Sequence, residues 1–404
     1  MPLESPWIPN GAVRVEGKMV VEVGSAKEVQ PRVGEEIIDL GETVLMPGLI
    51  NAHCHLDYSA LKYAISPMRS FTEWVVRLNS IKRQLGVEDI LSSIERGFRE
   101  AKDFGTTTVC SMVAFPELMR RLPEPPIRTW WFYEMIDIRH RVTSEEVVQG
   151  ALAFFDEQPE SLAQFGLNPH APYTASLLLY RLARACARSQ GDMLLTTHVS
   201  ESREELEMFC ESGGALYRFL EGLGRSMHDC GLDTPFGWLW RNGAIGPQWI
   251  LAHLNALEAS DFALLDSLDR GALPHVVHCP GSHAYFEHPP FPFSRLAGIG
   301  VNVCLGTDSL ASCHSLSLLG EVQRFQTQNP ELSPEELIGM ITLAPAKALR
   351  QEGRLGCIRA GAFADLIAIP HVGRESEAAA AVVAHEKTVD WMMVNGKVVS
   401  AFLP

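Results

Sequence analysis

The sequence lacks the features of a membrane-spanning or disulfide-bonded protein. Its 404 residues contain no apolar run of about 18 residues, so we expect no transmembrane helix. The first residues, from Met1 to Pro6, show no basic region and no apolar segment of signal length. The nine cysteines are odd in number and include no Cys-x-x-Cys pair, which favours reduced thiols over a disulfide framework. We therefore expect a cytoplasmic protein.

Positive charge is also scarce. The chain has 34 Lys and Arg against 49 Asp and Glu, which gives a formal net charge of −15 and a pI near 5.4. An acidic protein is repelled by phosphates and anionic lipids, so we expect neither nucleic acid nor a membrane as a partner. The hydrophobic content of 46% is that of a globular protein with a large core. A chain of this length suits one large α/β barrel with an appendage, or about two to three ordinary domains.

Both ends of the chain have the pattern of short strands. Two β-hairpins are predicted at residues 12–23 and 391–400, each with a glycine in its turn, and a further strand is predicted at 364–369. Because chain ends commonly lie close together, the two ends can form one small β domain. We expect this composite domain to comprise residues 1–48 and 353–404, and residues 49–352 to form the rest.

The middle of the chain alternates apolar β-like runs with amphipathic stretches. Eight runs are predicted strands, at residues 50–55, 107–112, 129–133, 165–170, 193–198, 249–253, 276–279 and 301–308. Helical patterns separate most of them, as at 72–85, 87–104, 176–189 and 260–270. Eight strands with intervening helices are what a (β/α)8 TIM barrel requires. The longer segment 213–246 is expected to add helices over one end.

The first predicted strand of the barrel ends in His53-Cys54-His55. In a strand, residues i and i+2 point to the same face, so His53 and His55 would lie side by side while Cys54 points away. Two imidazoles at that spacing can bind a divalent metal ion, although alternating histidines also occur without one. The other ligands must come from elsewhere in the chain.

Further predicted strands also end in a His or an Asp, namely at His170, His198, His253 and Asp308. Active sites of (β/α)8 barrels lie at the carboxyl ends of the strands, so we expect these side chains to converge. A lone histidine is usually structural. The recurrence at the ends of separate strands predicts a metal site instead.

The motifs, taken in order, resemble the amidohydrolase superfamily. The resemblance is to its branch of metal-dependent deaminases and chlorohydrolases, which act on adenosine derivatives, S-adenosylhomocysteine, guanine, aminofutalosine and triazines. The matching segments are Pro47-Gly-Leu-Ile-Asn-Ala-His-Cys-His55, His170-Ala-Pro-Tyr-Thr174, His198-Val-Ser-Glu201, Ala252-His-Leu-Asn255, His278-Cys-Pro-Gly-Ser282, Gly306-Thr-Asp-Ser309 and Gly361-Ala-Phe-Ala-Asp-Leu-Ile367. The resemblance spans nearly the whole chain. It implies a (β/α)8 barrel with a metal site, and a small β-sandwich formed by the N- and C-terminal segments.

The resemblance also implies roles for residues at matching positions. One divalent ion would be held by His53, His55, His198 and Asp308, with Zn²⁺ favoured over Fe²⁺ or Mn²⁺. Glu201 would be the proton shuttle, and His253 would orient the attacking water. Asp308 would also help to accept the water proton, and His170 would contact the substrate. Relatives with two ions usually bridge them with a carboxylated lysine, but no lysine occurs between Lys102 and Lys347, so we expect a single ion.

Expectations for the substrate pocket are less specific. Trp74 could stack on a planar ring or only pack a helix, and Glu134 could face the pocket or pair with Arg139. His283 stands where relatives often carry Asn, as does Cys313, and both departures concern substrate identity. The other histidines are expected to be structural or on the surface: His140, His228, His275, His278, His288, His314, His371 and His385.

Together these features predict a hydrolytic deaminase that acts on an aminated purine-like heterocycle or nucleoside derivative. A metal-activated water would attack the ring carbon, and ammonia would leave. Three alternatives stay open: a chlorohydrolase or alkylamine hydrolase acting on triazine-like rings, a cyclic amide or N-acyl hydrolase, and a non-catalytic scaffold. A homodimer is the usual expectation for such an enzyme.

Overall fold

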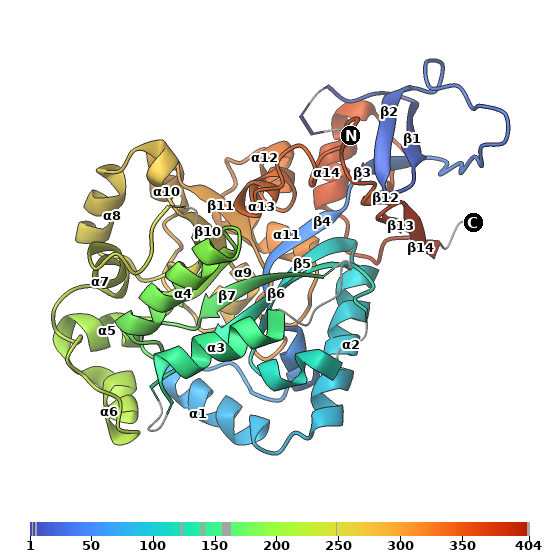
Figure 1. The fold of residues 1–404 in the computed structure, drawn as a ribbon. Helices are drawn as coiled ribbons and strands as arrows, with labels where there is room; N and C mark the ends of the chain where they lie inside the picture. The colour runs from blue at the N-terminus through green and yellow to red at the C-terminus, as the bar shows by residue number, and fades with distance from the viewer. Residues whose placement is uncertain are drawn as a thin grey trace.

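The centre of the molecule is a sheet of eight parallel strands (Figure 1). The computed structural model describes residues 1, 3–4, 6–121, 124–138, 142–155, 163–247 and 249–401. In order around the sheet, the strands are β4 (Leu49–Cys54), β5 (Thr106–Val113), β6 (Arg128–Met135), β7 (Ala163–Pro169), β8 (Leu194–Val199), β9 (Ile250–His253), β10 (His275–His278) and β11 (Asn302–Leu305). Each pairs in parallel with the next along the chain. All eight predicted barrel strands are confirmed.

The first and last of these strands meet and close the sheet. Cys54 and Asp308 form a parallel bridge. The carbonyl of His53 accepts the N–H groups of Thr307 and Asp308, each at 3.1 Å. Gly306 permits this approach, because a Cβ there would lie 2.8 Å from the His53 carbonyl oxygen. The predicted (β/α)8 barrel is therefore confirmed.

Helices cover the outside of the barrel. The longer ones are α1 (Phe71–Lys82), α2 (Val87–Asp103), α3 (Ser144–Phe155), α4 (Leu177–Ser189), α5 (Arg203–Glu211), α6 (Gly214–Gly222), α8 (Ala259–Asp266) and α11 (Leu318–Gln328). The shorter ones are α7 (Pro235–Arg241), α9 (Pro280–Tyr285), α10 (Phe293–Ile299), α12 (Pro334–Gly339), α13 (Leu343–Ala348) and α14 (Ala378–Val383). The 3₁₀ turns are η1 (Leu56–Leu61), η2 (Pro116–Arg121), η3 (Arg270–Ala272) and η4 (Glu375–Glu377). The expected extra helices within 213–246 are α6 and α7.

Two predicted helices are shorter in the structure. The helix expected at 72–85 ends at Lys82, and Gly86 then serves as the N-cap of α2. The helix expected at 260–270 ends at Asp266, and residues 270–272 form the separate turn η3. Gly271 lies in that turn, and a glycine inside a helix costs about 1 kcal/mol relative to alanine. In both cases the apolar periodicity of the sequence therefore extends beyond the last helical residue.

The core has an inner and an outer layer. Alternate strand residues, such as Cys110, Met112 and Phe132, form a cluster inside the barrel. The residues between them, such as Val109 and Trp131, pack in a larger cluster with the surrounding helices. Polar residues that continue the inward row at the carboxyl ends of the strands therefore reach the mouth of the barrel.

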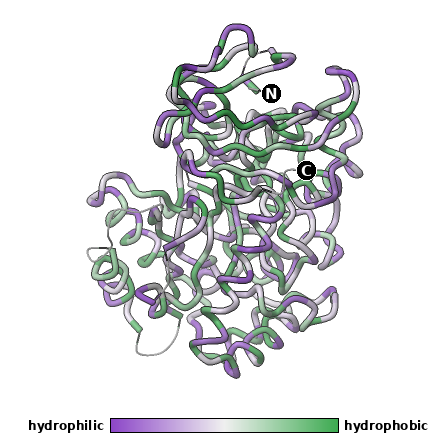
Figure 2. The backbone as a smooth tube through the Cα atoms, turned by 90° about the vertical axis from the view of Figure 1, so that its right-hand side faces the viewer, coloured by the Kyte–Doolittle hydropathy of each residue, from purple (hydrophilic) through white to green (hydrophobic). Residues whose placement is uncertain are grey.

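The two ends of the chain build separate antiparallel sheets beside the barrel. β1 (Gly11–Glu16) pairs with β2 (Met19–Ser25), and a four-stranded sheet has the order β14 (Lys397–Ala401), β13 (Trp391–Val394), β12 (Leu366–Pro370) and β3 (Thr43–Pro47). Both predicted hairpins are confirmed. The two sheets share one apolar cluster, and Figures 1 and 2 show these first and last segments gathered on one side of the barrel. The domain boundaries at 48 and 353 stay a prediction.

Across the part of the chain that the structure describes, no helix is both long enough and apolar enough to cross a membrane.

Candidate active site

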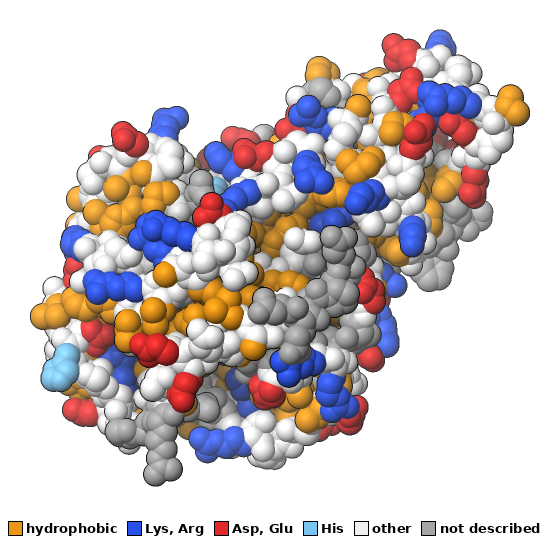
Figure 3. Space-filling view, in the orientation of Figure 1, with side chains coloured by type: hydrophobic (Ala, Val, Ile, Leu, Met, Phe, Trp, Pro, Cys, Tyr) orange, Lys and Arg blue, Asp and Glu red, His pale blue; other side chains and the backbone are white. Residues whose placement is uncertain are grey.

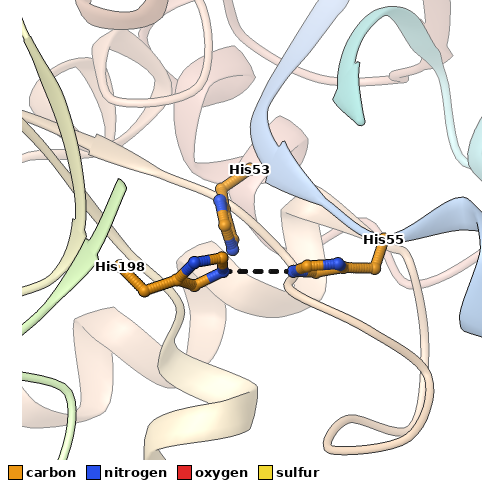
Figure 4. A group of neighbouring side chains, drawn as sticks. All are labelled: His53, His55 and His198. Carbon is orange, nitrogen blue, oxygen red and sulfur yellow. Dashed lines mark hydrogen bonds between the residues drawn. The ribbon is translucent and has the colours of Figure 1, made fainter. Parts of the chain in front are cut away.

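Three histidines from two strands meet at the mouth of the barrel (Figure 4). His53 and His55 lie at the end of β4, and His198 lies at the end of β8. One ring nitrogen of each lies within 4.8 Å of the others, and all three side chains are buried. His55 Nε2 and His198 Nε2 are 3.2 Å apart. The structure thus brings together the three histidines that the sequence analysis expected as metal ligands.

A second group of three lies beside the first, and it consists of Glu201, His253 and Asp308. Asp308 Oδ1 lies 3.8 Å from His53 Nε2 and 3.7 Å from His55 Nε2. Its other oxygen, Oδ2, accepts the hydroxyl of Ser282 at 2.7 Å and that of Ser312 at 3.0 Å. Because two hydroxyls occupy Oδ2, Asp308 directs Oδ1 towards the histidines.

The protonation of the histidines suits metal binding. The Nδ1 atom of His198 lies 2.8 Å from the carbonyl of His170, an acceptor, so Nδ1 carries the proton and Nε2 keeps its lone pair. Burial lowers the pKa of His198 to about 4. Burial and the neighbouring histidines hold the pKa of His53 and His55 well below the usual range. These imidazoles are therefore neutral at pH 7, which is the form that binds a metal.

The same histidines leave buried nitrogens without partners. Among the described residues, both ring nitrogens of His53, Nδ1 of His55 and Nε2 of His253 find no hydrogen-bond partner. A buried polar atom without a partner costs about 1–3 kcal/mol, so such atoms usually serve a ligand. A tetrahedral ion with bonds of about 2.0–2.1 Å needs donor atoms about 3.3 Å apart. Three of the donor separations, at 3.2, 3.7 and 3.8 Å, lie near this value, and the three histidine nitrogens all lie within 4.8 Å of one another.

Glu201 is placed to act as an acid. Its carboxyl is buried, and burial, followed by the charges of Asp308 and Glu205, raises its pKa well above the usual range. His253 Nε2 lies 3.7 Å from Glu201 Oε1. Burial and nearby histidines lower the pKa of His253. A carboxyl with a raised pKa therefore lies beside an imidazole with a lowered pKa, next to the candidate metal ligands.

The backbone at this mouth is unusual. Ser200, His253, Leu254 and Asp308 all have positive φ values, of 51°, 78°, 51° and 57°. Residues other than glycine rarely adopt this backbone conformation. They occur most often at active sites, where contacts with the surrounding structure stabilise them. Each of these four residues is a candidate catalytic residue or is the sequence neighbour of one.

Two of the expected substrate contacts lie at the mouth. The ring of His170 is 4.9 Å from that of His198, and His170 Nδ1 lies 2.6 Å from the Thr174 hydroxyl. Glu134 follows Trp130 and Phe132 in the inward row of β6. Burial, followed by the charge of Glu134, raises the pKa of the Tyr58 hydroxyl well above its usual range, so Glu134 lies near the residues that follow His55. Arg139, the alternative partner of Glu134, lies outside the described residues, as does His140.

The other two expected contacts are engaged by protein groups. Trp74 is buried, donates its Nε1–H to the Ala311 carbonyl at 3.3 Å and packs with its ring 5.3 Å from that of Phe286. These contacts favour the helix-packing interpretation. His283 Nε2 lies 2.8 Å from the carbonyl of Pro289. Contact of Trp74 or His283 with a substrate stays a prediction.

Some residues at the site were not found from the sequence. Ser282 and Ser312 hold Asp308, and Tyr58 stacks on His55 with ring centroids 5.3 Å apart and an interplanar angle of 2°. Lys82 donates a 2.5 Å hydrogen bond to the Tyr58 hydroxyl. A partial signal existed, since Ser282 lies within a matching motif, but its hydrogen bond to Asp308 forms only when the segments that follow β10 and β11 meet.

The chain is similar to known proteins along most of its length. Residues 44–399 match the model of the Amidohydrolase family. A 5-methylthioadenosine/S-adenosylhomocysteine deaminase of Pyrococcus furiosus is 29% identical, over 95% of this chain and 91% of that protein. An adenosine deaminase from Xanthomonas campestris, solved with bound zinc, has a TM-score of 0.81 at 22% identity, over 99% of this chain and 91% of that one. Atrazine chlorohydrolase from Arthrobacter aurescens, also complexed with zinc, has a TM-score of 0.78 at 20% identity, over 96% and 90%. These structural likenesses show a shared fold.

Proposed function

Because the chain belongs to the amidohydrolase family, we propose that it is a metal-dependent hydrolytic deaminase of an aminated purine nucleoside derivative. The observation that carries this proposal is the buried carboxyl of Glu201, which clusters with His253 and Asp308 beside the three histidines. Deamination needs a proton donor of this kind, since a ring nitrogen must gain a proton as the adjacent carbon becomes tetrahedral. The curated relatives, named as deaminases of adenosine derivatives, give independent support.

The proposed metal ligands are His53, His55, His198 and Asp308. When bound there, a divalent ion supplies Lewis-acid activation of a water molecule. Zinc is favoured because two proteins of the same fold were solved with zinc. Iron and manganese also suit three imidazoles and one carboxylate.

The protein side chains have separate tasks in the proposed reaction. Glu201 donates its proton to the ring nitrogen of the substrate, since its carboxyl is buried, has a raised pKa and clusters with His253 and Asp308. His253 holds the attacking water through Nε2, which has no partner among the described residues. Asp308 uses its remaining oxygen, Oδ1, to accept a proton from that water. Asp308 then passes the proton it accepted to the exocyclic amine, which leaves as ammonia when the carbon–nitrogen bond breaks. The remaining hydroxyl proton returns to Glu201 as the ring carbonyl forms.

A triazine hydrolase is the second candidate, because an atrazine chlorohydrolase shares the fold. It would release chloride or an alkylamine from a ring of similar shape. The experiment that separates the two is a screen of zinc-loaded protein for release of ammonia. The panel comprises S-adenosylhomocysteine, 5-methylthioadenosine, adenosine, guanine, a pterin and an amino-triazine, with chloride measured in parallel for a chlorotriazine. We expect ammonia from an adenosine derivative. Chloride release without ammonia, or cleavage of amides alone, would overturn the proposal.

The proposal also includes the location, oligomeric state and partners of the enzyme. We expect a cytoplasmic homodimer that acts on small heterocycles. On the face shown in Figure 3, Lys and Arg side chains are interspersed with Asp and Glu side chains, and those of the described residues form no large basic patch there. This surface, with the net charge of −15, gives no attraction for nucleic acid. Light scattering coupled to size-exclusion chromatography tests the dimer.

A further inference from the structure

The peptide segment that carries Glu201 is held from two sides by side chains that the proposed reaction does not use. Glu205, one helical turn further along in α5, accepts the N–H of Ser200 at 3.0 Å and the N–H of Glu201 at 2.8 Å. On the other side, Asn255 donates its Nδ2–H to the Glu201 carbonyl at 3.0 Å. Both polar groups of the Glu201 main chain are therefore fixed by contacts outside the strand.

Glu205 has no access to solvent, and its two oxygens divide between the two amides. Its exposed fraction is 0%, with Oε1 on Ser200 and Oε2 on Glu201. Burial raises the pKa of Glu205 to about 7, and the hydrogen bonds from backbone N–H groups oppose this rise because they stabilise the ionised carboxylate. A glutamine would match this arrangement poorly, because its amide has only one accepting oxygen and its NH₂ group would face an N–H donor.

The backbone conformation at Ser200 requires stabilising contacts. Ser200 has a φ of +51°, in the left-handed region that L side chains rarely adopt. The turn brings two successive N–H groups to one side, an arrangement that favours an anion. Without the carboxylate, the two buried N–H groups would lose their acceptor and the turn would relax towards ordinary geometry.

An ordinary helix cap does not explain these contacts. Ser202 is the N-cap of α5 and accepts the N–H of Glu205 at 3.1 Å, so the pair resembles a capping box. In a capping box the glutamate reaches back to the N–H of the capping residue. Here the carboxylate interacts with the Ser202 N–H and also reaches past it to the N–H groups of the two preceding residues, one of which is the candidate acid.

We propose that Glu205 is a positioning residue for Glu201, which holds the acid at the distance from the substrate that proton transfer requires. The inference rests on the proposed function, because it assumes that Glu201 is the proton donor. Among the described residues, the Glu205 side chain forms no hydrogen bond or ion pair with the candidate metal ligands, and it acts through the main chain of Ser200 and Glu201.

The test is a double-mutant cycle on zinc-loaded protein, built from Glu205→Gln, Glu201→Gln and the double variant. In the wild-type background we expect Glu205→Gln to lower kcat by about 10- to 100-fold, within the range of general acid–base catalysis, while KM and zinc content stay unchanged. In the Glu201→Gln background we expect a further change of less than about twofold, since effects of residues that act as a unit are non-additive.

The matched control is Glu336→Gln in α12. Glu336 forms a capping box with Ser333, accepting its N–H at 2.8 Å, but lies on the surface away from the mouth. We expect this variant to lose a little thermal stability and no kcat. If Glu205→Gln does not fold, Glu205→Asp keeps two oxygens on a shorter side chain and enters the same cycle.

The outcomes separate the two proposals. Equal losses of kcat in both backgrounds, an unchanged kcat, or a raised KM alone would show that Glu205 does not act through Glu201. If the wild-type enzyme releases no ammonia from any substrate, the proposed function fails. The cycle is then run on whichever hydrolytic substrate the screen identifies, and it still decides whether Glu205 acts through Glu201.

Discussion

Both ends of the barrel bury polar side chains, but the amino ends hold an ion-pair network whose members are hydrogen-bonded to one another. At the amino ends of the strands, Arg128 donates to Asp365 through Nε at 3.0 Å and to Asn395 Oδ1 at 3.2 Å. Asp365 also accepts the N–H of Asn395 at 2.6 Å, and the Arg128 guanidinium lies 4.0 Å from the centre of the Phe363 ring. This network joins the barrel to the terminal sheet.

At the carboxyl ends, by contrast, buried nitrogens of His53, His55 and His253 have no partner among the described residues. Folding alone gives no reason to keep such atoms, since each costs free energy. The network of paired side chains at the amino ends stabilises the fold. The unpaired nitrogens at the carboxyl ends indicate a site that a ligand completes. Substitutions at the two ends should therefore affect different measurements.

The largest effect is expected from removal of a histidine at the mouth. His198→Ala should lose bound zinc and reduce turnover below detection, because one of four proposed ligands is missing. Its thermal stability without metal should be close to that of the metal-free wild type. Mass spectrometry measures the zinc content, and ammonia release measures the turnover. The matched control is His385→Ala, a half-buried histidine whose Nε2 lies 3.3 Å from the Thr388 carbonyl, and it should change neither quantity. Full zinc occupancy in His198→Ala would contradict the ligand assignment.

Glu201→Gln separates the acid from the metal at the same end. The variant should bind zinc normally and lose about 10²–10⁴ in kcat, because the side chain keeps its size but cannot donate a proton to the ring nitrogen. Steady-state kinetics with a metal analysis of the same sample give the answer. Near-normal turnover at full zinc content would remove Glu201 from the mechanism.

At the opposite end, Arg128→Ala should reduce stability without reducing kcat. The exposed fractions of the Arg128 and Asp365 side chains are 8% and 5%, so the variant leaves a buried carboxylate without its counter-ion. Loss of one partner of a buried pair costs about 3–5 kcal/mol. Urea unfolding measures the loss, and kcat per folded molecule should be unchanged. The double variant Arg128→Met with Asp365→Leu should recover part of the lost stability. A drop in the kcat of Arg128→Ala per folded molecule would contradict the division between the two ends.

The smallest predicted effect is on the pH dependence of stability and concerns His275, also at the amino ends. Burial lowers the pKa of His275 to about 4, and the Asn302 amide lies 2.9 Å from its Nδ1. Between pH 6.5 and 4 the unfolded chain binds a proton that the folded chain does not, so this contribution to stability falls as the pH falls through that window. His275→Gln should reduce the loss between pH 7 and pH 5 by about 1–2 kcal/mol, measured by urea unfolding. Identical pH profiles would show that the side chain is not buried in its neutral form.

Much of the site could be predicted because its signals are local. The strands are recognised from apolar runs, and their last residues are read directly from the sequence, as with His198 and Asp308. The parallel arrangement of a barrel then places those residues at one end. The packing of Trp74 could not be predicted in this way, since its partners Ala311 and Phe286 are more than 200 positions away.

The sequence by itself determined which side chains are available at the mouth of the barrel and in what order they arrive. Only the tertiary structure decided which way they face. Counted from the inward residues Ile50 and Ala52, simple alternation would turn Cys54 into the barrel and His53 out of it. The irregular register between Asn51 and Cys54 in the pairing of β4 with β5 reverses this, and Cys54 packs in the outer cluster. The reason is physical: register, closure at Gly306 and the contacts of Ser282 and Glu205 depend on segments that meet only in the folded chain.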